Sequence, residues 1–176
     1  MTANWEIRTA RADEYAALRA LTAAAYAEYA PAMGDHWDDY RRGMLDRLDG
    51  AVAERIVAVR AGALLGSVLL YPGGSSALAP DGSVLDFAAP EIGLLAVPPE
   101  RRGQGIARAL TAECVRRARA AGSTVLALHT MEMMRGALAL YAGMGFVRDP
   151  EHDFSPAPDV LVRAYRLALA APSSEA

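Results

Sequence analysis

Cysteine is nearly absent from this sequence, because Cys114 is the only one in 176 residues. One cysteine cannot form an intrachain disulfide, so the composition favours a reducing compartment, and we expect a cytoplasmic protein. Long apolar runs are absent too, since no stretch approaches the roughly 20 residues of a membrane-spanning helix. The first residues, Met1–Glu6, also lack the basic start and apolar run of a signal peptide. We therefore expect no membrane partner.

The sequence also lacks an excess of positive charge. Its formal net charge is −3 and its pI is near 5.6, whereas nucleic-acid-binding proteins usually carry a basic excess or a basic stripe. We therefore expect no nucleic-acid partner. The hydrophobic fraction of 53% is enough for a core without a structural metal, so no metal site is expected. The length predicts one domain over residues 1–170 and a disordered tail at 171–176.

Hydrophobic periodicity predicts strands and helices arranged around one mixed sheet. Strand-like runs occur at residues 5–8, 55–60, 63–71, 91–97, 124–130, 146–148 and 160–169. Helical spacing occurs at residues 13–30, 35–48, 106–120 and 135–142. The segment 91–130 has the strand–helix–strand order of a crossover connection, so the sequence predicts an α/β fold.

Proline and glycine mark the expected boundaries of these elements. Pro31 and Gly34 should end the first helix, and Gly50 should end the second. Ala61-Gly62 separates two β-rich runs and predicts the tight turn of a hairpin. The stretch from Tyr71 to Ser83 is rich in turn-forming residues, so we expect a loop there.

The segment from Glu91 to Leu110 carries the clearest functional signal. A buried strand ends at Pro98-Pro99, and the turn Arg102-Gly-Gln-Gly-Ile-Ala107 opens directly into a helix. The first turn of a helix has backbone N–H groups without partners and a partial positive charge. Glycine lets that backbone approach a phosphate closely. The segment therefore predicts an anion-binding loop, with Arg102 and Arg108 adding positive charge.

Two other kinds of phosphate-binding loop fit this segment poorly. A Walker A loop requires Gly-Lys-Ser/Thr, which is absent. A dinucleotide-binding fingerprint requires a glycine near Arg108, a tight junction between strand and glycine, and an acidic residue about 20 residues further on. The segment meets none of these three requirements, so neither nucleotide-binding motif is expected.

The loop instead resembles a motif of the GNAT superfamily of N-acetyltransferases. Arg102–Ala107 is similar to the family's Q/R-x-x-G-x-G/A pattern, and the strand Leu94–Pro98 before it resembles the family's fourth strand. Ala137–Phe146 resembles the family's Ala-x-x-Leu-Tyr-x-x-x-Gly-Phe signature. The order of the expected strands and helices resembles that of the family over residues 1–170, and the motifs themselves lie within residues 91–147. It implies an α/β fold with a mixed, largely antiparallel sheet that is splayed at the cofactor strand and flanked by helices.

The resemblance implies that the chain binds acetyl-CoA as its cofactor. The backbone of Leu95, Ala96 and Val97 would pair with the pantetheine arm as an added strand does, and an N–H near Val97 would polarise the thioester carbonyl. The N–H groups of the loop would bind the pyrophosphate, and their residues are Gly103, Gln104, Gly105, Ile106, Ala107 and Arg108. One departure is Met134, where the family often has an Asn that contacts the cofactor, so that polar contact is lost or replaced here.

The resemblance also implies direct attack of an amine on the acetyl thioester. An amine with a pKa near 10 must lose a proton first. Glu91, at the head of the cofactor strand, is the first candidate for this base, and His129 is the second. Tyr141 stands where the family commonly places the tyrosine that protonates the leaving thiolate. Each residue also has a purely structural interpretation. Glu91 could be a solvated carboxylate, His129 a structural histidine and Tyr141 a packing residue.

The acceptor is expected to be a primary amine on a small molecule or at a peptide N-terminus. In the resembling fold the first two helices form the wall of the acceptor site, which here offers Tyr26, Tyr29, Met33, His36 and Trp37. Four acidic side chains in that region would suit a cationic amine: Glu28, Asp35, Asp38 and Asp39. Two alternatives stay open, a catalytically silent acyl-CoA-binding regulatory domain and transfer of a longer acyl group. The last strand, Val160–Leu169, would suit a homodimer interface.

Overall fold

The computed structural model describes residues 5–78 and 84–169. Its main sheet has eight strands in these ranges, in the order β1-β2-β3-β6-β7-β10-β8, with β9 also paired to β10. Within the described residues only β6 and β7 run parallel, so the sheet is mixed and largely antiparallel, as expected. The strands are β1 (Glu6–Thr9), β2 (Glu54–Arg60), β3 (Ala63–Tyr71), β6 (Glu91–Ala96), β7 (Val125–Thr130), β8 (Val147–Arg148), β9 (Phe154–Ala157) and β10 (Val160–Ala168).

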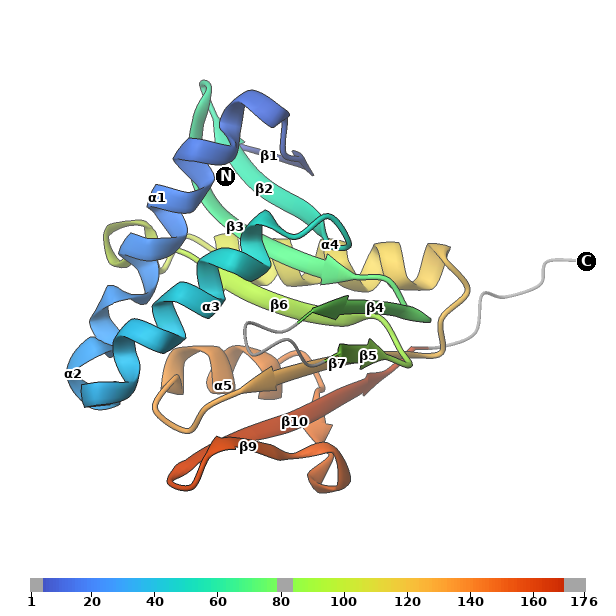
Figure 1. Ribbon diagram of the computed structural model, residues 1–176. Helices are drawn as coiled ribbons and strands as arrows, with labels where there is room; N and C mark the ends of the chain where they lie inside the picture. The colour runs from blue at the N-terminus through green and yellow to red at the C-terminus, as the bar shows by residue number, and fades with distance from the viewer. Residues whose placement is uncertain (1–4, 79–83, 170–176) are drawn as a thin grey trace, which may run out of the picture.

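Helices cover both faces of this sheet (Figure 1). Helices α1 (Tyr15–Tyr26) and α3 (Trp37–Asp49) pack on one face, with the single turn α2 (Ala30–Met33) between them. Helices α4 (Ile106–Ala120) and α5 (Arg135–Ala142) pack on the opposite face. Each face buries its own apolar cluster, so the two layers of helices are held by the hydrophobic effect on both sides of the sheet.

The strands β6 and β7 separate from each other after a short paired stretch. Their register contains only Glu91↔Ala127 and Ile92↔Leu128, although β6 continues to Ala96 and β7 to Thr130. Beyond this pairing, the β3–β6 register shifts between Ser67 and Leu69, and Leu94 takes a φ of +46°. This bulge turns the end of β6 away from β7. The expected splay at the cofactor strand is therefore confirmed.

The first helical region differs from the expected single helix. A 3₁₀ turn, Ala27–Tyr29, interrupts it after α1, and the chain then continues through α2. Pro31 does not end the helix, because it lies in the first turn of α2, where the missing N–H has no helical partner to lose. The chain reverses at Gly34, which has a φ of +52°. Gly50 caps α3 as predicted.

The loop expected from Tyr71 to Ser83 is partly wrong. Within the described ranges, β4 (Ser75–Leu78) pairs with β5 (Val84–Phe87) in a separate two-stranded sheet. The ring of Phe87 stacks on Tyr71, with centroids 4.3 Å apart. Each strand has only four residues, too few to show a period among the turn formers. Residues 79–83, and the tail expected at 171–176, lie outside the described residues.

The turn between β2 and β3 carries avoidable strain. Arg60 pairs with Ala63, so Ala61 and Gly62 form a two-residue loop, and both have positive φ, +49° and +79°. An alanine in this region costs about 1–2 kcal/mol. We expect Ala61→Asn to raise the free energy of unfolding by about 1 kcal/mol, because Asn tolerates positive φ. Urea unfolding measures this free energy, and Ala61→Val should lower it, since a β-branched residue tolerates positive φ less well. Equal stability of the two variants would show that the turn is not strained.

Candidate functional site

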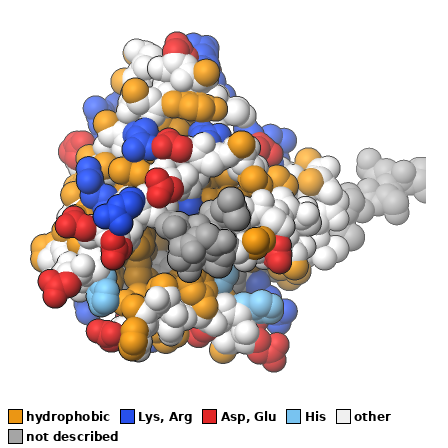
Figure 2. Space-filling model, in the orientation of Figure 1, with side chains coloured by type: hydrophobic (Ala, Val, Ile, Leu, Met, Phe, Trp, Pro, Cys, Tyr) orange, Lys and Arg blue, Asp and Glu red, His pale blue; other side chains and the backbone are white. Residues whose placement is uncertain are grey.

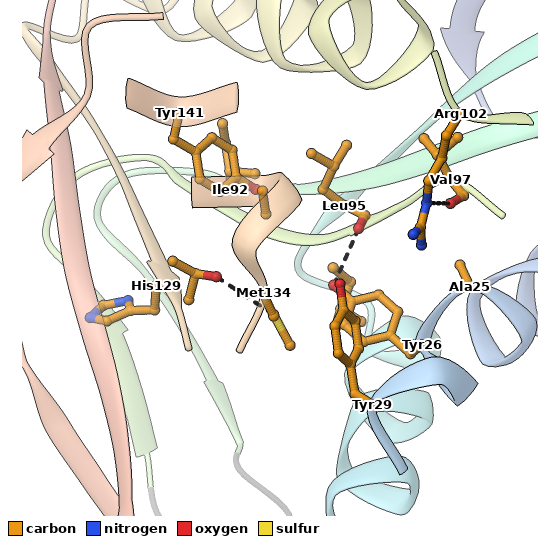
Figure 3. A pocket seen from close by; sticks show the side chains of 13 residues that line it. Ala25, Tyr26, Tyr29, Ile92, Leu95, Val97, Arg102, His129, Met134 and Tyr141 are labelled. Atoms are coloured by element: carbon orange, nitrogen blue, oxygen red, sulfur yellow. Dashed lines mark hydrogen bonds between the residues drawn. The ribbon is translucent and has the colours of Figure 1, made fainter. Parts of the chain in front are cut away.

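The separation of β6 and β7 opens a small pocket of about 60 Å³. Helix α1, the 3₁₀ turn after it, both strands and α5 contribute to its walls (Figure 3). The strand ends thus form the floor of a site between the two helical layers. Its lining residues are Ala25, Tyr26, Tyr29, Ile92, Leu94, Leu95, Val97, Arg102, His129, Thr130, Met134, Ala137 and Tyr141.

The glycine loop places the start of α4 beside this pocket. Gly103 and Gly105 have φ of +74° and +79°, and Gly105 is the N-terminal cap of α4. Glycine has no side chain that could cap the helix, so the first N–H groups of α4 are left for another partner. A Cβ built on either glycine meets nothing within 4 Å among the described residues. The loop therefore presents unpartnered donors to open space, as an anion-binding site requires.

Arg102, the first residue of the loop motif, lines the pocket and links the loop to the helical layer. Its Nε donates to the carbonyl of Val97 at 3.1 Å, and its guanidinium forms an ion pair with Glu28 in the turn Ala27–Tyr29. The hydrogen bond from Arg102 lowers the pKa of Glu28. Arg108 lies further along α4, and its side chain reaches the carbonyl of Gly143 at 3.5 Å, past the end of α5.

The three cofactor-strand residues occupy different positions. Leu95 and Val97 line the pocket. Ala96 is buried and faces away, where it packs in the core beneath α1 and α3. The carbonyls of the first two already accept side-chain hydrogen bonds, Leu95 from the Tyr26 hydroxyl at 3.3 Å and Val97 from Arg102. These bonds hold the end of β6 in its separated position.

Tyr141 lies in the pocket wall formed by α5. It is one helical turn after Ala137, so both face the pocket. The side chain is 5% exposed, and burial raises its pKa well above the ordinary value. Its hydroxyl has no hydrogen-bond partner among the described residues. The Gly145-Phe146 pair of the same motif anchors it: Gly145 has a φ of +88°, and the Phe146 ring packs 5.5 Å from the Tyr141 ring.

Met134 precedes α5, where the resembling family often has Asn. Its side chain is 7% exposed and lines the pocket. Its sulfur accepts a hydrogen bond from the Thr130 hydroxyl at 3.5 Å (Figure 3). The position therefore presents a thioether instead of an amide, and the amide's polar contact is replaced by an apolar surface.

Glu91 and His129 form a pair across the two separating strands. The Nδ1 of His129 lies 2.9 Å from Oε1 of Glu91, and its Nε2 lies 3.0 Å from the carbonyl oxygen of His152. Both partners are acceptors, so both ring nitrogens donate and the imidazolium form is favoured. Burial lowers the pKa of His129, but the hydrogen bond and charge of Glu91, the carbonyl of His152 and the charge of Asp153 together raise it above its ordinary value. The reading of Glu91 as a solvated carboxylate is wrong, because its side chain is 19% exposed and paired.

This pair predicts a pH-dependent contribution to stability. The pKa of His129 is higher in the folded chain than its ordinary value near 6.5. Its contribution is therefore complete below that value and is lost as pH rises through the folded pKa. We expect His129→Gln to destabilise the fold more at about pH 6 than at about pH 9. Urea unfolding at both pH values measures this, with half-exposed His36→Gln as control; a pH-independent difference would contradict it.

The acceptor-side residues are only partly where they were expected. Tyr26 and Tyr29 line the pocket, but Met33, His36 and Trp37 do not. The four acidic side chains proposed to attract a cationic amine also lie outside its lining: Glu28, Asp35, Asp38 and Asp39. Glu28 is already neutralised by Arg102, and the other three are exposed on the turn before α3 and in its first turn. These charges therefore do not line the pocket, and their attraction for a cationic amine stays a prediction.

Two further properties bear on the chemistry of the site. Within residues 5–78 and 84–169, no group of three or more His, Cys, Asp or Glu side chains is placed to hold a metal ion. No helix in these ranges combines the length and apolar character needed to cross a bilayer. The side-chain donors that line the site belong to Arg102, His129, Thr130, Tyr26, Tyr29 and Tyr141.

Comparison with known proteins points to the same family as the glycine loop and the pocket. The family model described as Acetyltransferase (GNAT) family matches residues 15–146. N-acetyltransferase 8B of Rattus norvegicus is 45% identical over 58 residues, which is 33% of this chain and 26% of that protein. The chain therefore matches about a quarter of the length of this relative.

Solved structures share the fold at low sequence identity. A GNAT-family acetyltransferase described as putative, from Desulfovibrio desulfuricans, has a TM-score of 0.66 and 18% identity, covering 94% of this chain and 99% of its own. A GNAT family acetyltransferase from Brucella melitensis, solved in complex with acetyl-CoA, has a TM-score of 0.60 and 23% identity, covering 94% and 88%. With the family model matching most of its length, this chain belongs to the GNAT acetyltransferase family.

Proposed function

We propose that this chain transfers an acetyl group from acetyl-CoA directly to a primary amine of a small molecule or a peptide N-terminus. The observation that carries the proposal is the separated β6–β7 pair, with an uncapped helix N-terminus at one end of the opening and Tyr141 in its wall. Backbone donors suit a pyrophosphate, and the edge of β6 that has left β7 suits an amide-bearing arm, which would share the Leu95 and Val97 carbonyls with Tyr26 and Arg102 or displace those bonds.

The residues present fit this cofactor. Gly103 and Gly105 leave open space beside their N–H donors, and Leu95 and Val97 line the pocket. When bound, acetyl-CoA supplies the thioester whose C–S bond is exchanged for the C–N bond of the product amide, and whose thiolate then takes up a proton.

We assign the proton-transfer roles to two side chains. Glu91 does not line the pocket, so it takes a proton from the acceptor's ammonium through a water, and the free amine then attacks. His129 is then a positioning residue, because its imidazolium holds Oε1 of Glu91, while Oε2 has no hydrogen-bond partner among the residues that the structure describes. Tyr141 holds a proton at its hydroxyl over the whole neutral range, since burial raises its pKa. That hydroxyl can donate to the departing sulfur.

The alternative is an acyl-CoA-binding regulatory domain without turnover. A pure sensor has no need of the Glu91–His129 pair or of a buried tyrosine hydroxyl that faces the pocket without a partner among the described residues. Both features favour the enzyme over the sensor. We also propose a cytoplasmic location, since the single cysteine is buried and unpaired. A homodimer through β10 stays a prediction.

The test is release of free thiol from acetyl-CoA across a panel of amines, amino acids and peptides. The chain contains no lysine, so its own side chains offer no ε-amine as a competing acceptor. The proposal expects thiol release that depends on an added amine and an acetylated product of matching mass. Tight binding of CoA without amine-dependent release would favour the regulatory domain.

A further inference from the structure

The charged groups of the pocket occur as neutralised pairs. Among the described lining residues, only Arg102 and His129 carry positive charge, and no carboxylate lines the pocket. Arg102 is paired with Glu28, and His129 with Glu91. A second cationic centre on an acceptor would therefore lose its hydration without meeting a free carboxylate, which is costly in a partly buried site.

Most of the other lining residues are apolar or aromatic; Thr130 is polar, and its hydroxyl already donates to the Met134 sulfur. We assign the start of α4, the end of β6 and the Tyr141 side of α5 to acetyl-CoA, which leaves the α1 side and Met134, before α5, for the acceptor. That side presents Tyr29, whose ring is partly buried and meets Tyr26 edge-on at 5.9 Å. Leu94 and Met134 complete the surface. A planar or branched apolar group would bury area against the Tyr29 ring, Leu94 and Met134.

The approach to this side has the same character. Trp37, Met133, Val160 and Val162 are partly buried and pack on the cluster that contains Met134. Figure 2 shows hydrophobic side chains on the floor of a hollow between the helical layer and the β9–β10 hairpin. His36 lies 3.7 Å from Asp159, a contact that brings the turn between β9 and β10 against the segment after α2. The hairpin thus narrows the approach.

We propose that the acceptor is a monoamine with an apolar or aromatic body, and that diamines and polyamines are disfavoured. This inference rests on the proposed function, because it names the substrate class of the same site. Paired charges remove the attraction for a second ammonium, and the tyrosine and methionine surface stabilises a hydrophobic group beside the reacting nitrogen. Methionine adapts its shape to such groups, since its side chain is flexible and polarisable.

Binding and turnover should be measured separately. Calorimetric titration of the CoA-bound protein with 2-phenylethylamine and with 1,4-diaminobutane tests the inference, and thiol release with acetyl-CoA tests the function. We expect 2-phenylethylamine to bind at least about tenfold more tightly, a difference of about 1.4 kcal/mol. Equal or tighter binding of the diamine, or no binding of 2-phenylethylamine, would overturn the inference. Binding without turnover would leave the inference standing and contradict the proposed function.

Single substitutions test whether the preference for an apolar monoamine comes from the surface formed by Tyr29, Leu94 and Met134. Tyr29→Ala should weaken binding of 2-phenylethylamine about tenfold and leave diamine binding nearly unchanged. Met133→Glu places a free carboxylate at the approach and should narrow or reverse the preference. Tyr15→Ala removes an exposed tyrosine of α1 outside the pocket and serves as the control with unchanged affinities. A Tyr29→Ala protein that keeps the preference, while folded by circular dichroism, would contradict the assignment.

Discussion

Replacement of Tyr141 by Phe should lower kcat by about 100-fold or more, while the KM for acetyl-CoA changes little. The substitution removes one hydroxyl and keeps the ring that packs against Phe146. The lost group is the proton donor assigned to the departing sulfur, so the loss should fall on the chemical step. Thiol release at saturating amine measures kcat, and its dependence on acetyl-CoA measures KM.

The control for this variant is Tyr165→Phe. Tyr165 lies on β10, outside the pocket, with its ring 5.1 Å from the Arg148 guanidinium. Both variants should unfold close to the wild type, because the Tyr141 hydroxyl has no hydrogen-bond partner among the described residues and its removal leaves none unsatisfied. Equal activity of Tyr141→Phe and wild type would show that Tyr141 is a packing residue.

Replacement of Gly105 by Ala should raise the KM for acetyl-CoA about tenfold or more. Gly105 caps α4 at a φ of +79°, so alanine strains the backbone by about 1–2 kcal/mol. Its methyl group would also enter the open space beside the N–H donors. Both effects disturb the place assigned to the pyrophosphate. Steady-state kinetics and calorimetry with CoA measure the loss.

Gly122→Ala separates strain from ligand contact. Gly122 follows the other end of α4 with a φ of +78°, and a Cβ there likewise meets nothing within 4 Å among the described residues. Its alanine variant should therefore lose a similar amount of stability, about 1–2 kcal/mol, but bind CoA as the wild type does. If both variants weaken CoA binding equally, the loop would have no special role in holding the pyrophosphate.

Local patterns in the sequence were enough to predict most of the scaffold. The β2–β3 hairpin follows from Ala61-Gly62, and the start of α4 follows from the glycines after Pro98-Pro99. Both depend on backbone preferences of a few neighbouring residues. The region of α1 and α2 was harder, because Pro31 is as acceptable in a first helical turn as after a helix end. The β4–β5 pair was missed because its strands are short.

Contacts between distant segments could not be predicted. The Glu91–His129 pair joins residues 38 positions apart, and the Arg102–Glu28 pair joins residues 74 positions apart. Each depends on how strands and helices pack, so no local signal marks it. Both Glu91 and His129 were candidates, but their pairing, the carbonyl of His152 and the role of Thr130 beside Met134 became apparent only in the structure. The exclusion of the acidic residues near the start of α3 from the pocket lining also depends on this packing, so the sequence could not show it.

The most direct test of acetyl transfer at the β6–β7 opening is a crystal structure of the protein with CoA. The account predicts the pyrophosphate within hydrogen-bond distance of N–H groups between Gly103 and Arg108, and the pantetheine arm along Leu95–Val97. It also predicts the sulfur within reach of the Tyr141 hydroxyl. A cofactor bound elsewhere, or a sulfur separated from Tyr141 by the wall of α5, would contradict it.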